Sequence, residues 1–324
     1  MHFVFFVVKF SLNSPMKHFI PTIALLFAIA PISVRAEEEP KHPVKPLLWK
    51  IEGGDLKKPS YLFGTIHLGG GALNQLHPTA EKAYNEASFI LTEIPMDMKT
   101  QMGMIPKLMR NDGKTLSVSI GPDLSKQLNE ELRAINPALN STPFEPMLTW
   151  AIAATLPMIK AQLSGATAVD KMVWDRAVKD GKKTGAMETA DFQMGLFNNF
   201  TEEEQVKILS ETLRIMRTER ADGKDSLKEL IDAYIQGNAE LIKRLMDKAT
   251  DEMIKGPEKE LGKKFFDKLL TKRDETMAAS IAEQLKTSPE TVHFFAAGAA
   301  HFTGDPSIRS HLEKAGYKIT RIDK

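Results

Sequence analysis

Cysteine is absent from all 324 residues of the sequence, and so is any strong excess of charge of one sign. Without cysteine the chain has no disulfide framework, no thiolate nucleophile and no site for lipid attachment behind a signal sequence. The 43 basic and 42 acidic residues give a formal net charge of +1. Near neutrality with mixed signs leaves no basic footprint for nucleic acid, which we therefore exclude as a partner.

The common motifs of hydrolases and nucleotide-binding proteins are also missing. The sequence has no Gly-x-Ser-x-Gly turn, no His-Glu-x-x-His helix and no phosphate-binding loop. The run Gly69–Gly71 stands alone and does not make a nucleotide site. Catalytic chemistry must therefore come from residues outside these motifs.

A signal sequence is predicted at the N-terminus. Residues 16–18 are positively charged, residues 19–32 are apolar, and residues 34–36 offer the small side chains that a signal peptidase reads. The apolar run is too short for a membrane-spanning helix. We predict a signal peptide over residues 1–36, cleaved after Ala36, with Met16 as the candidate true start.

One long uncleaved anchor is the alternative, because residues 3–8 are also apolar. Lys9 and the polar residues 11–14 argue against a continuous span. Cleavage would remove three basic residues and no acid, which leaves a net charge of −2 on a chain long enough for one large domain or two small ones. We expect an exported bacterial protein, periplasmic or secreted, without a membrane span after cleavage.

The rest of the chain reads as an α/β (α+β) protein. After a flexible lead-in at 37–46, we predict a single domain over 47–324 with a mixed central sheet and a large helical insertion at about 97–286. Strand patterns occur at 47–51, 60–66, 89–94, 183–187, 291–297 and 317–322, and the first two should form a hairpin. Helical patterns occur at 78–87, 97–110, 122–135, 144–164, 169–180, 201–220, 225–236, 238–254, 257–270, 272–286 and 305–315, the last with Pro306 in its first turn.

Two predicted strands end in the same pattern, Gly-x-x-His. The first motif runs from Gly64 to His67 and the second from Gly298 to His301. Glycine can take backbone angles closed to other residues, so we expect a sharp turn where each strand ends. The histidine would then emerge at the carboxyl edge of the sheet, where α/β proteins bind ligands. The repeated pattern predicts two imidazoles that converge on one pocket.

Two acidic residues also end predicted strands, Glu93 and Glu188. An unpaired charge inside an apolar strand is costly, so Glu93 indicates a function or a specific salt bridge. Two imidazoles and one or two carboxylates form a first shell suited to a divalent metal, which could activate a water molecule near neutral pH. Without a metal, the same side chains could act as a histidine general base with carboxylates that orient it.

Structural roles remain open for each candidate. A histidine at a strand end is commonly a hydrogen-bonded structural residue. Glu188 could lie beside the next helix start, with Thr189 or Asp191 as the cap, and Asp170 reads first as an N-cap. Arg273 lies in a charged segment, where it is either a surface residue or the partner of a carboxylate.

Three further groups of residues are interpreted first as structural. His77, His293 and His311 lack the glycine frame and are expected to be structural or exposed. The methionines that follow residue 95 suggest adaptable core, with a binding surface as the alternative. The charge-dense helices between 201 and 272 read as solvated faces.

Several short motifs, taken in order, resemble a known family. They are Tyr61–His67, Leu91–Glu93, Val169–Lys171, Gly185–Thr189, Arg273–Asp274 with Met277–Ala278, Gly298–Phe302 and Gly316–Ile319. Together they are similar to the TraB/GumN group, which is related to the Tiki proteases, over about residues 47–322. The resemblance implies an α/β core with paired Gly-x-x-His motifs and inserted helices, and its Tiki members imply metal-dependent proteolysis with manganese or cobalt favoured.

The resemblance assigns family positions to individual residues of this chain. They are Gly64, His67, Glu93, Glu188, Gly298 and His301, with Asp170 and Arg273 as weaker matches. Two positions depart from the pattern, Met187 where leucine is expected and Asp274 where the family often has asparagine. More distant relatives of the erythromycin-esterase type use a histidine without a required metal, which keeps a metal-free reaction open.

The sequence therefore predicts an exported metal-dependent hydrolase acting on a peptide or another small molecule. We expect His67, Glu93 and His301 to bind a divalent metal (Mn, Co or Zn), and Glu188 and Arg273 to assist catalysis. A metal-free esterase-type hydrolase that uses histidine as the base is one alternative. A periplasmic binding protein without turnover is the other.

Overall fold

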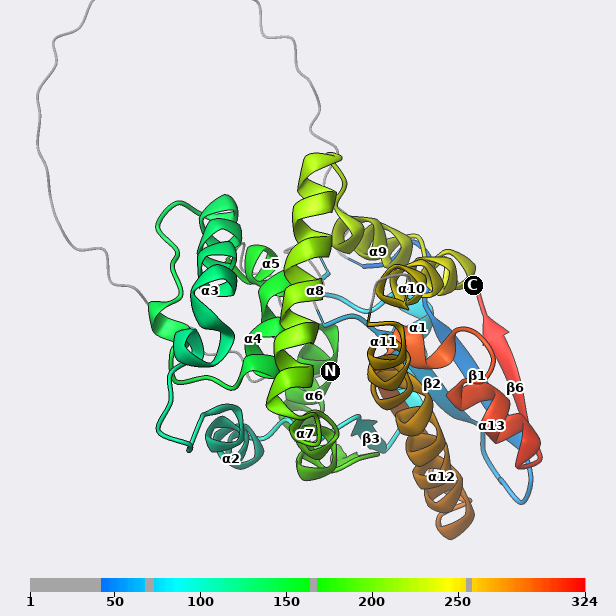
Figure 1. The fold of residues 1–324 in the computed structure, drawn as a ribbon. Coiled ribbons are helices and arrows are strands. Elements are labelled where there is room, and N and C mark those ends of the chain that lie inside the picture. The colour runs from blue at the N-terminus through cyan, green and yellow to red at the C-terminus, as the bar shows by residue number, and fades with distance from the viewer. Residues whose placement is uncertain (1–41, 68–72, 164–167, 255–257, 324) are drawn as a thin grey trace, which may run out of the picture.

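The computed structural model describes residues 42–67, 73–163, 168–254 and 258–323 (Figure 1). The predicted signal peptide, the first half of the predicted lead-in (37–41) and Gly69–Gly71 lie outside the described residues, and their predictions stand untested. Within the described ranges, no helix is both long enough and apolar enough to cross a membrane.

A mixed sheet of six strands organises the described chain, in the order β4-β3-β5-β2-β1-β6. The four strands from β4 to β2 run parallel, and β1 pairs antiparallel with both β2 and β6. The predicted α/β class and the predicted hairpin are therefore confirmed. The strands are β1 Leu48–Gly53, β2 Ser60–Thr65, β3 Phe89–Thr92, β4 Lys183–Ala186, β5 His293–Gly298 and β6 Tyr317–Ile322.

The centre of the sheet brings the two Gly-x-x-His motifs side by side. Strands β2 and β5 are buried at every position and pair in parallel, with Gly64 opposite Ala297 and Thr65 opposite Gly298. These strands are apolar on both faces because helices cover both sides of the sheet, as is usual for parallel strands. Since parallel strands end at the same edge, the residues that follow β2 and β5 must emerge together.

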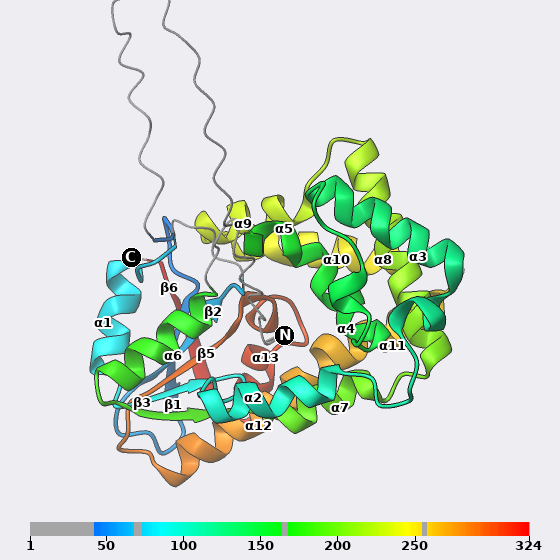
Figure 2. The same cartoon turned by 90° about the vertical axis from the view of Figure 1, so that its left-hand side faces the viewer.

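Helices cover both faces of the sheet (Figures 1 and 2). On one face lie α1 (Pro78–Glu86) and α6 (Val169–Lys179), and on the other lie α12 (Lys272–Thr287) and α13 (Ile308–Lys314). The predicted start of the last helix was wrong, because α13 begins at Ile308 with Ser307 as its N-cap. Pro306 therefore precedes the helix. The Ser307 side chain accepts the Ser310 N–H, and this cap explains why the helix begins only at Ile308.

The remaining helices form a second body of structure beside the sheet, with a hydrophobic cluster of its own around Trp150, Leu209 and Leu213. In Figure 2 these helices arch away from the strands. They are α2 Met98–Leu108, α3 Leu116–Ile135, α4 Thr149–Thr155, α5 Ile159–Leu163, α7 Ala190–Asn198, α8 Glu202–Ala221, α9 Ser226–Ile235, α10 Ala239–Ile254 and α11 Lys259–Phe266. Helices α9 and α10 instead pack mainly on the sheet cluster, through Tyr234, Ile242 and their neighbours.

Three of the predicted helices have different limits or breaks. The one predicted at 144–164 is divided into α4, a 3₁₀ turn at Leu156–Met158 and α5, with Pro157 at the break. Helix α3 begins six residues earlier than predicted, at Leu116, and kinks at Gly121, whose φ is 77°. The helix predicted at 257–270 ends earlier, because α11 stops at Phe266 and a π-helical turn at Asp267–Thr271 leads into α12.

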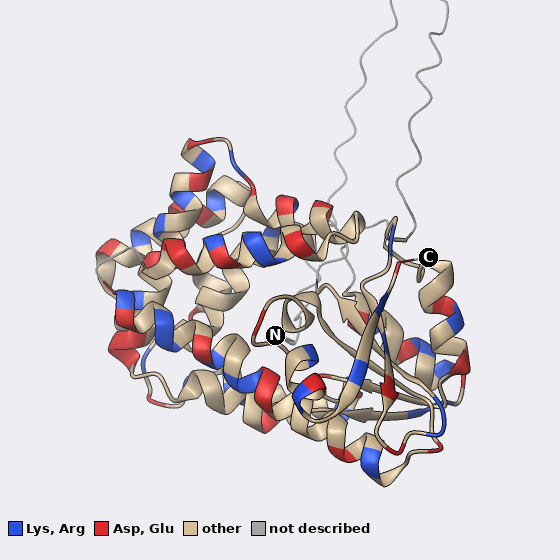
Figure 3. Ribbon diagram, turned by 90° about the vertical axis from the view of Figure 1, so that its right-hand side faces the viewer, with Lys and Arg blue, Asp and Glu red and all other residues tan. Residues whose placement is uncertain are grey.

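Two predictions about the helical part can be judged directly. The capping box at the start of α8 is confirmed, because the Thr201 side chain accepts from Glu204 N–H and the Glu204 carboxylate accepts from Thr201 N–H. Charged side chains of both signs are intermixed along the outer helices, as expected for solvated faces (Figure 3). The core prediction holds for Met96 and Met104 and is wrong for Met98 and Met102, which are 73% and 59% exposed on α2.

Candidate active site

Four of the sequence-predicted residues meet at the carboxyl edge of the parallel strands. His67 follows β2, Glu93 follows β3, Glu188 follows β4 and His301 follows β5. The pairing of β3 and β4 continues past their last residues, since Glu188 N–H donates to the Glu93 carbonyl at 2.7 Å. The strand order thus brings together residues that lie up to 234 positions apart in the sequence.

The two imidazoles face the same oxygen atom. The distance from His67 Nε2 to Glu93 Oε1 is 4.0 Å, and that from His301 Nε2 to the same oxygen is 3.9 Å. Glu93 is fully buried, and its Oε1 also accepts the Gly298 N–H at 2.7 Å. The predicted convergence of the two histidines on one acidic residue is therefore present in the structure.

Each imidazole is held from behind by an aspartate. Asp170 Oδ2 lies 3.0 Å from His67 Nδ1, and Asp274 Oδ1 lies 2.6 Å from His301 Nδ1. A carboxylate at Nδ1 makes that nitrogen the donor and leaves Nε2 as the electron-pair donor toward the site. Burial raises the pKa of Asp274 above its ordinary value, although the neighbouring His301 opposes this rise.

The N-cap interpretation of Asp170 was wrong. The N-cap of α6 is Ala168, and Asp170 lies in the first turn, buried, with its side chain on His67. By contrast, Thr189 is the N-cap of α7, as proposed for the region after Glu188, and accepts the Phe192 N–H. Glu188 itself therefore has no capping role and stays available to the site.

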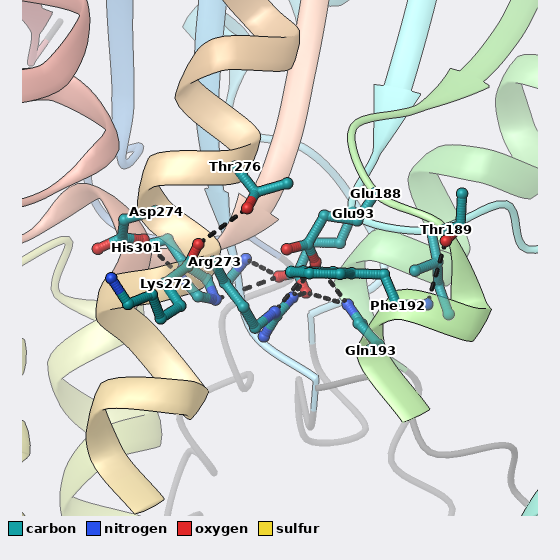
Figure 4. A network of polar contacts seen from close by, with 12 residues as sticks. Glu93, Glu188, Thr189, Phe192, Gln193, Lys272, Arg273, Asp274, Thr276 and His301 are labelled. Carbon is teal, nitrogen blue, oxygen red and sulfur yellow. Dashed lines mark hydrogen bonds and ion pairs between the residues drawn. The ribbon is translucent and has the colours of Figure 1, made fainter. Parts of the chain in front are cut away.

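Arg273 joins the two glutamates. It lies on α12, is 1% exposed, and donates from Nε to Glu188 Oε2 at 3.0 Å and from Nη2 to Glu93 Oε2 (Figure 4). Burial alone would lower the pKa of Arg273, but the two carboxylates outweigh that effect and raise it. Arg273 is therefore the partner of two carboxylates and not a surface residue, the other role that the sequence left open.

A π-helical turn precedes this pair of residues. Arg273 and its neighbour Asp274 both point into the site, although adjacent residues of a helix are about 100° apart around its axis. The turn at Asp267–Thr271 ends directly before α12 begins. Such turns change the register of a helix and occur often at functional sites.

The glycines of both motifs serve a different purpose from the one predicted. Neither Gly64 nor Gly298 has a positive φ. They are required for space, because a Cβ at Gly298 would lie 3.3 Å from both Glu93 Oε1 and His67 Nε2, and one at Gly64 would lie 2.9 Å from Leu47 Cβ. A bare backbone at Gly298 therefore keeps the point between the imidazoles and Glu93 open.

The chemistry of this donor set suits a cation. Four carboxyl groups, those of Glu93, Asp170, Glu188 and Asp274, are buried around a single buried guanidinium. Such an excess of acid is costly in a low-dielectric interior unless a cation or protons offset it. Glu188 Oε1 is buried and has no hydrogen-bond partner among the described residues, which leaves one acceptor available.

The spacing is wider than that of a closed metal centre. Ligand atoms about 2.1 Å from a tetrahedral ion lie about 3.4 Å apart, which is shorter than the 3.9 and 4.0 Å separations seen here. Among the described residues, no group of three or more His, Asp or Glu side chains is arranged to hold an ion. The residue types, and the aspartates behind the two imidazoles, therefore fit a divalent metal. The distances between the imidazole nitrogens and Glu93 Oε1 are longer than those of a closed metal site.

Sequence reasoning missed one residue of the site entirely. Gln193, on α7, is 1% exposed and donates from Nε2 to Glu93 Oε2 at 3.3 Å and to Glu188 Oε2 at 3.1 Å. A helix start capped by Thr189 or Asp191 was anticipated after Glu188, but no helix range was given at 190–198, and a glutamine carries no distinctive signal. The Thr189 cap followed by Phe192, Met194 and Phe197 is the pattern that could have revealed the helix.

Two of the histidines interpreted as structural, His77 and His293, lie outside this cluster. His77 is the N-cap of α1 and accepts the Thr79 N–H, in line with a structural role. His293 is fully buried at the opposite end of β5, with its ring stacked on Phe295 at a centroid distance of 5.3 Å. Burial lowers the pKa of His293 to about 4.

Comparison with known proteins places these observations in context. Residues 47–321 match the sequence model of the TraB/PrgY/gumN family. The chain is 22% identical to metalloprotease TIKI2 of Danio rerio over 84% of its own length and 60% of that protein's. It is 22% identical to metalloprotease TIKI1 of Xenopus tropicalis over 91% and 67% of the two lengths, and 21% identical to human metalloprotease TIKI1 over 93% and 66%. No solved structure matches the chain.

Proposed function

Because the chain belongs to the TraB/PrgY/gumN family, we propose that it is an exported hydrolase that cleaves peptides with the help of a divalent metal ion. Its relatives named as metalloproteases support the reaction class. This chain spans about two thirds of the length of those relatives or less, so the substrate is proposed from the site alone. Peptides are favoured over other small molecules on the strength of the relatives' names.

One observation carries the proposal. Two imidazoles, each with an aspartate at Nδ1, present Nε2 to the same oxygen of Glu93 at 4.0 and 3.9 Å. We assign the ion to His67, Glu93 and His301, with manganese, cobalt or zinc as candidates. A bound ion of this kind would polarise a substrate carbonyl and make a water molecule more acidic.

The other side chains have roles that follow from their contacts. Arg273 pairs with both Glu93 and Glu188 and offsets negative charge in the buried site. Glu188 Oε1, with no partner in the described structure, is placed to accept a proton and pass it on to the leaving amine. Gly298 leaves room at the centre of the site for the reacting group.

The test compares the unmodified protein with His67→Ala, His301→Ala and a control, His42→Ala. His42 lies outside the site, in contact with His77. We expect the unmodified protein and the control to retain a divalent metal by elemental analysis and to cleave a peptide library. Both site variants should lose the metal and the cleavage. Full activity of His67→Ala would contradict the proposal.

A metal-free hydrolase remains the second candidate, and one observation favours it. The short His301–Asp274 contact of 2.6 Å is also what a histidine general base requires, and the described residues hold no closed three-ligand group. Exhaustive chelation separates the two functions. Cleavage that survives chelation, and is lost in His301→Ala, would support the metal-free reaction.

A further inference from the structure

In each glutamate of the site, one oxygen is clamped by two side chains and the other is not. Both clamped oxygens, Glu93 Oε2 and Glu188 Oε2, accept from Arg273 on α12 and from Gln193 on α7 (Figure 4). The other oxygens face different surroundings. Glu93 Oε1 lies toward the imidazoles and accepts the Gly298 N–H, and Glu188 Oε1 is without a partner in the described structure.

The amide orientation of Gln193 follows from this network. Only its Nε2 can donate to a carboxylate, so Nε2 must face the two glutamates and Oε1 must point away from them. Gln193 Oε1 is indeed buried without a hydrogen-bond partner among the described residues. A buried acceptor left unpaired costs free energy, which indicates that the two donated bonds are worth that cost.

Charge does not explain the presence of Gln193. Its amide is neutral, and Arg273 already supplies a positive charge to both glutamates. What Gln193 adds is a second direction of contact, because it reaches the same two oxygens from a helix on the other side of the site. Two side-chain donors from two helices restrict the rotation of each carboxylate. Without Gln193, Glu93 would keep its bonds to Arg273 and to the Gly298 N–H, whereas Glu188 would keep Arg273 as its side-chain donor in the described structure.

We propose that Gln193 is a positioning residue that holds Glu93 and Glu188 so that their Oε1 atoms face the reacting group. The inference rests on the proposed function, since it presumes that Glu93 binds a cation and that Glu188 accepts a proton. Gln193 itself touches neither imidazole in any described contact. Its effect should therefore appear in cation affinity and in kcat, with KM unchanged.

The experiment uses Gln193→Met, which keeps the length of the side chain and removes its donors. The matched control is Gln205→Met on α8, because Gln205 is also a buried glutamine with two hydrogen bonds, to Phe200 and Trp150, but lies outside the site. Calorimetric titration with Mn²⁺, peptide-cleavage kinetics and thermal unfolding are measured on all three proteins. Gln193→Asn serves as a second variant, which keeps an uncharged amide in place if the methionine variant does not fold.

We expect Gln193→Met to weaken Mn²⁺ binding by about tenfold to a hundredfold, the usual range for a residue that supports a metal ligand. Its kcat should fall while KM stays unchanged, and Gln205→Met should alter neither. Gln193→Asn should also weaken Mn²⁺ binding, because its amide is one methylene shorter and no longer reaches both glutamates.

Two results would overturn the inference in distinguishable ways. If the unmodified protein binds Mn²⁺ and Gln193→Met binds it equally well with the same kcat, the positioning role is refuted and the proposed function stands. If the unmodified protein neither binds Mn²⁺ nor cleaves peptide, the proposed function fails and this inference fails with it.

Discussion

In the sheet-based part of the molecule the charged side chains behind the strands are buried and bonded to one another, whereas on the helices beside it they lie mainly on the surface. Glu93, Asp170 and Arg273 are at most 1% exposed. On the outer helices, pairs such as Lys243 with Asp247 are spaced one turn apart and face water. Buried charge needs a partner or a ligand, and exposed charge needs neither. This difference indicates which charges serve the site.

The largest expected effect comes from the buried cation. Arg273→Met leaves the Glu93 and Glu188 carboxylates without their positive partner, so we expect a loss of about 3–5 kcal/mol in the free energy of unfolding. Arg214→Met removes a half-exposed partner of Glu211 and should cost less than about 1 kcal/mol. Urea unfolding of both variants measures the difference. Equal losses would break the contrast between buried and exposed charge.

Acid should weaken the protein through His293. Burial holds its pKa at about 4 in the folded state, below the ordinary 6.5, with a smaller contribution from the Lys183 charge. Above pH 6.5 both folded and unfolded states carry a neutral ring. Between pH 6.5 and 4 only the unfolded state takes up the proton, so stability falls as pH falls, by about 3 kcal/mol in total.

Replacing the ring nitrogens tests that assignment. His293→Phe should flatten the dependence of unfolding free energy on pH between 6.5 and 4, measured by urea unfolding at a series of pH values. The phenyl ring can keep the contacts with Phe89 and Phe295. An unchanged slope would mean that another group takes up the proton.

The glycine at the centre of the site should respond differently from a glycine on an exposed helix. Gly298→Ala puts a methyl group 3.3 Å from Glu93 Oε1 and His67 Nε2, so we expect lost Mn²⁺ binding and about 1–3 kcal/mol of destabilisation. Gly103→Ala on α2 meets nothing within 4 Å and should stabilise by about 0.5–1 kcal/mol. Unfolding curves and cation titration check both. Normal Mn²⁺ binding by Gly298→Ala would contradict the assigned centre.

A smaller loss than at Arg273 or Gly298 is expected at a helix end in the helical part. Thr201→Ala removes the side chain that accepts the Glu204 N–H and should cost about 1 kcal/mol. Thr201→Ser keeps the hydroxyl and should be close to neutral. The thermal midpoint of each variant gives the comparison, and Mn²⁺ binding should be unaffected in both. A loss as large as that of Arg273→Met would show that local capping outweighs the buried network.

Much of the fold was predictable because its signals are local. The strands around Leu62 and Phe295 are apolar runs bounded by turn residues, and the α8 cap is a four-residue pattern. Errors occurred where a local signal was ambiguous. Pro306 resembles the first turn of a helix, although the helix begins two residues later at Ile308.

The site was predictable only in outline. His67, Glu93, Glu188 and His301 were identifiable because strand ends of an α/β sheet share one edge. Their partners were not, since the aspartate on His67 comes from a helix 103 positions away and Gln193 lies 100 positions from Glu93. The reason for Gly298 was also hidden, because crowding by Glu93 and His67 is not visible in the motif.

The sequence by itself determined the strands, the helices and the strand ends that carry the candidate site residues. These features depend on neighbouring residues, through hydrophobic periodicity, capping residues and the paired Gly-x-x-His motifs. The order β4-β3-β5-β2 and the packing of α7 and α12 over that edge determined which side chains touch. Contacts among buried charges depend on distances between distant segments. Only the assembled fold can therefore set the aspartates behind the histidines and the clamp across the two glutamates.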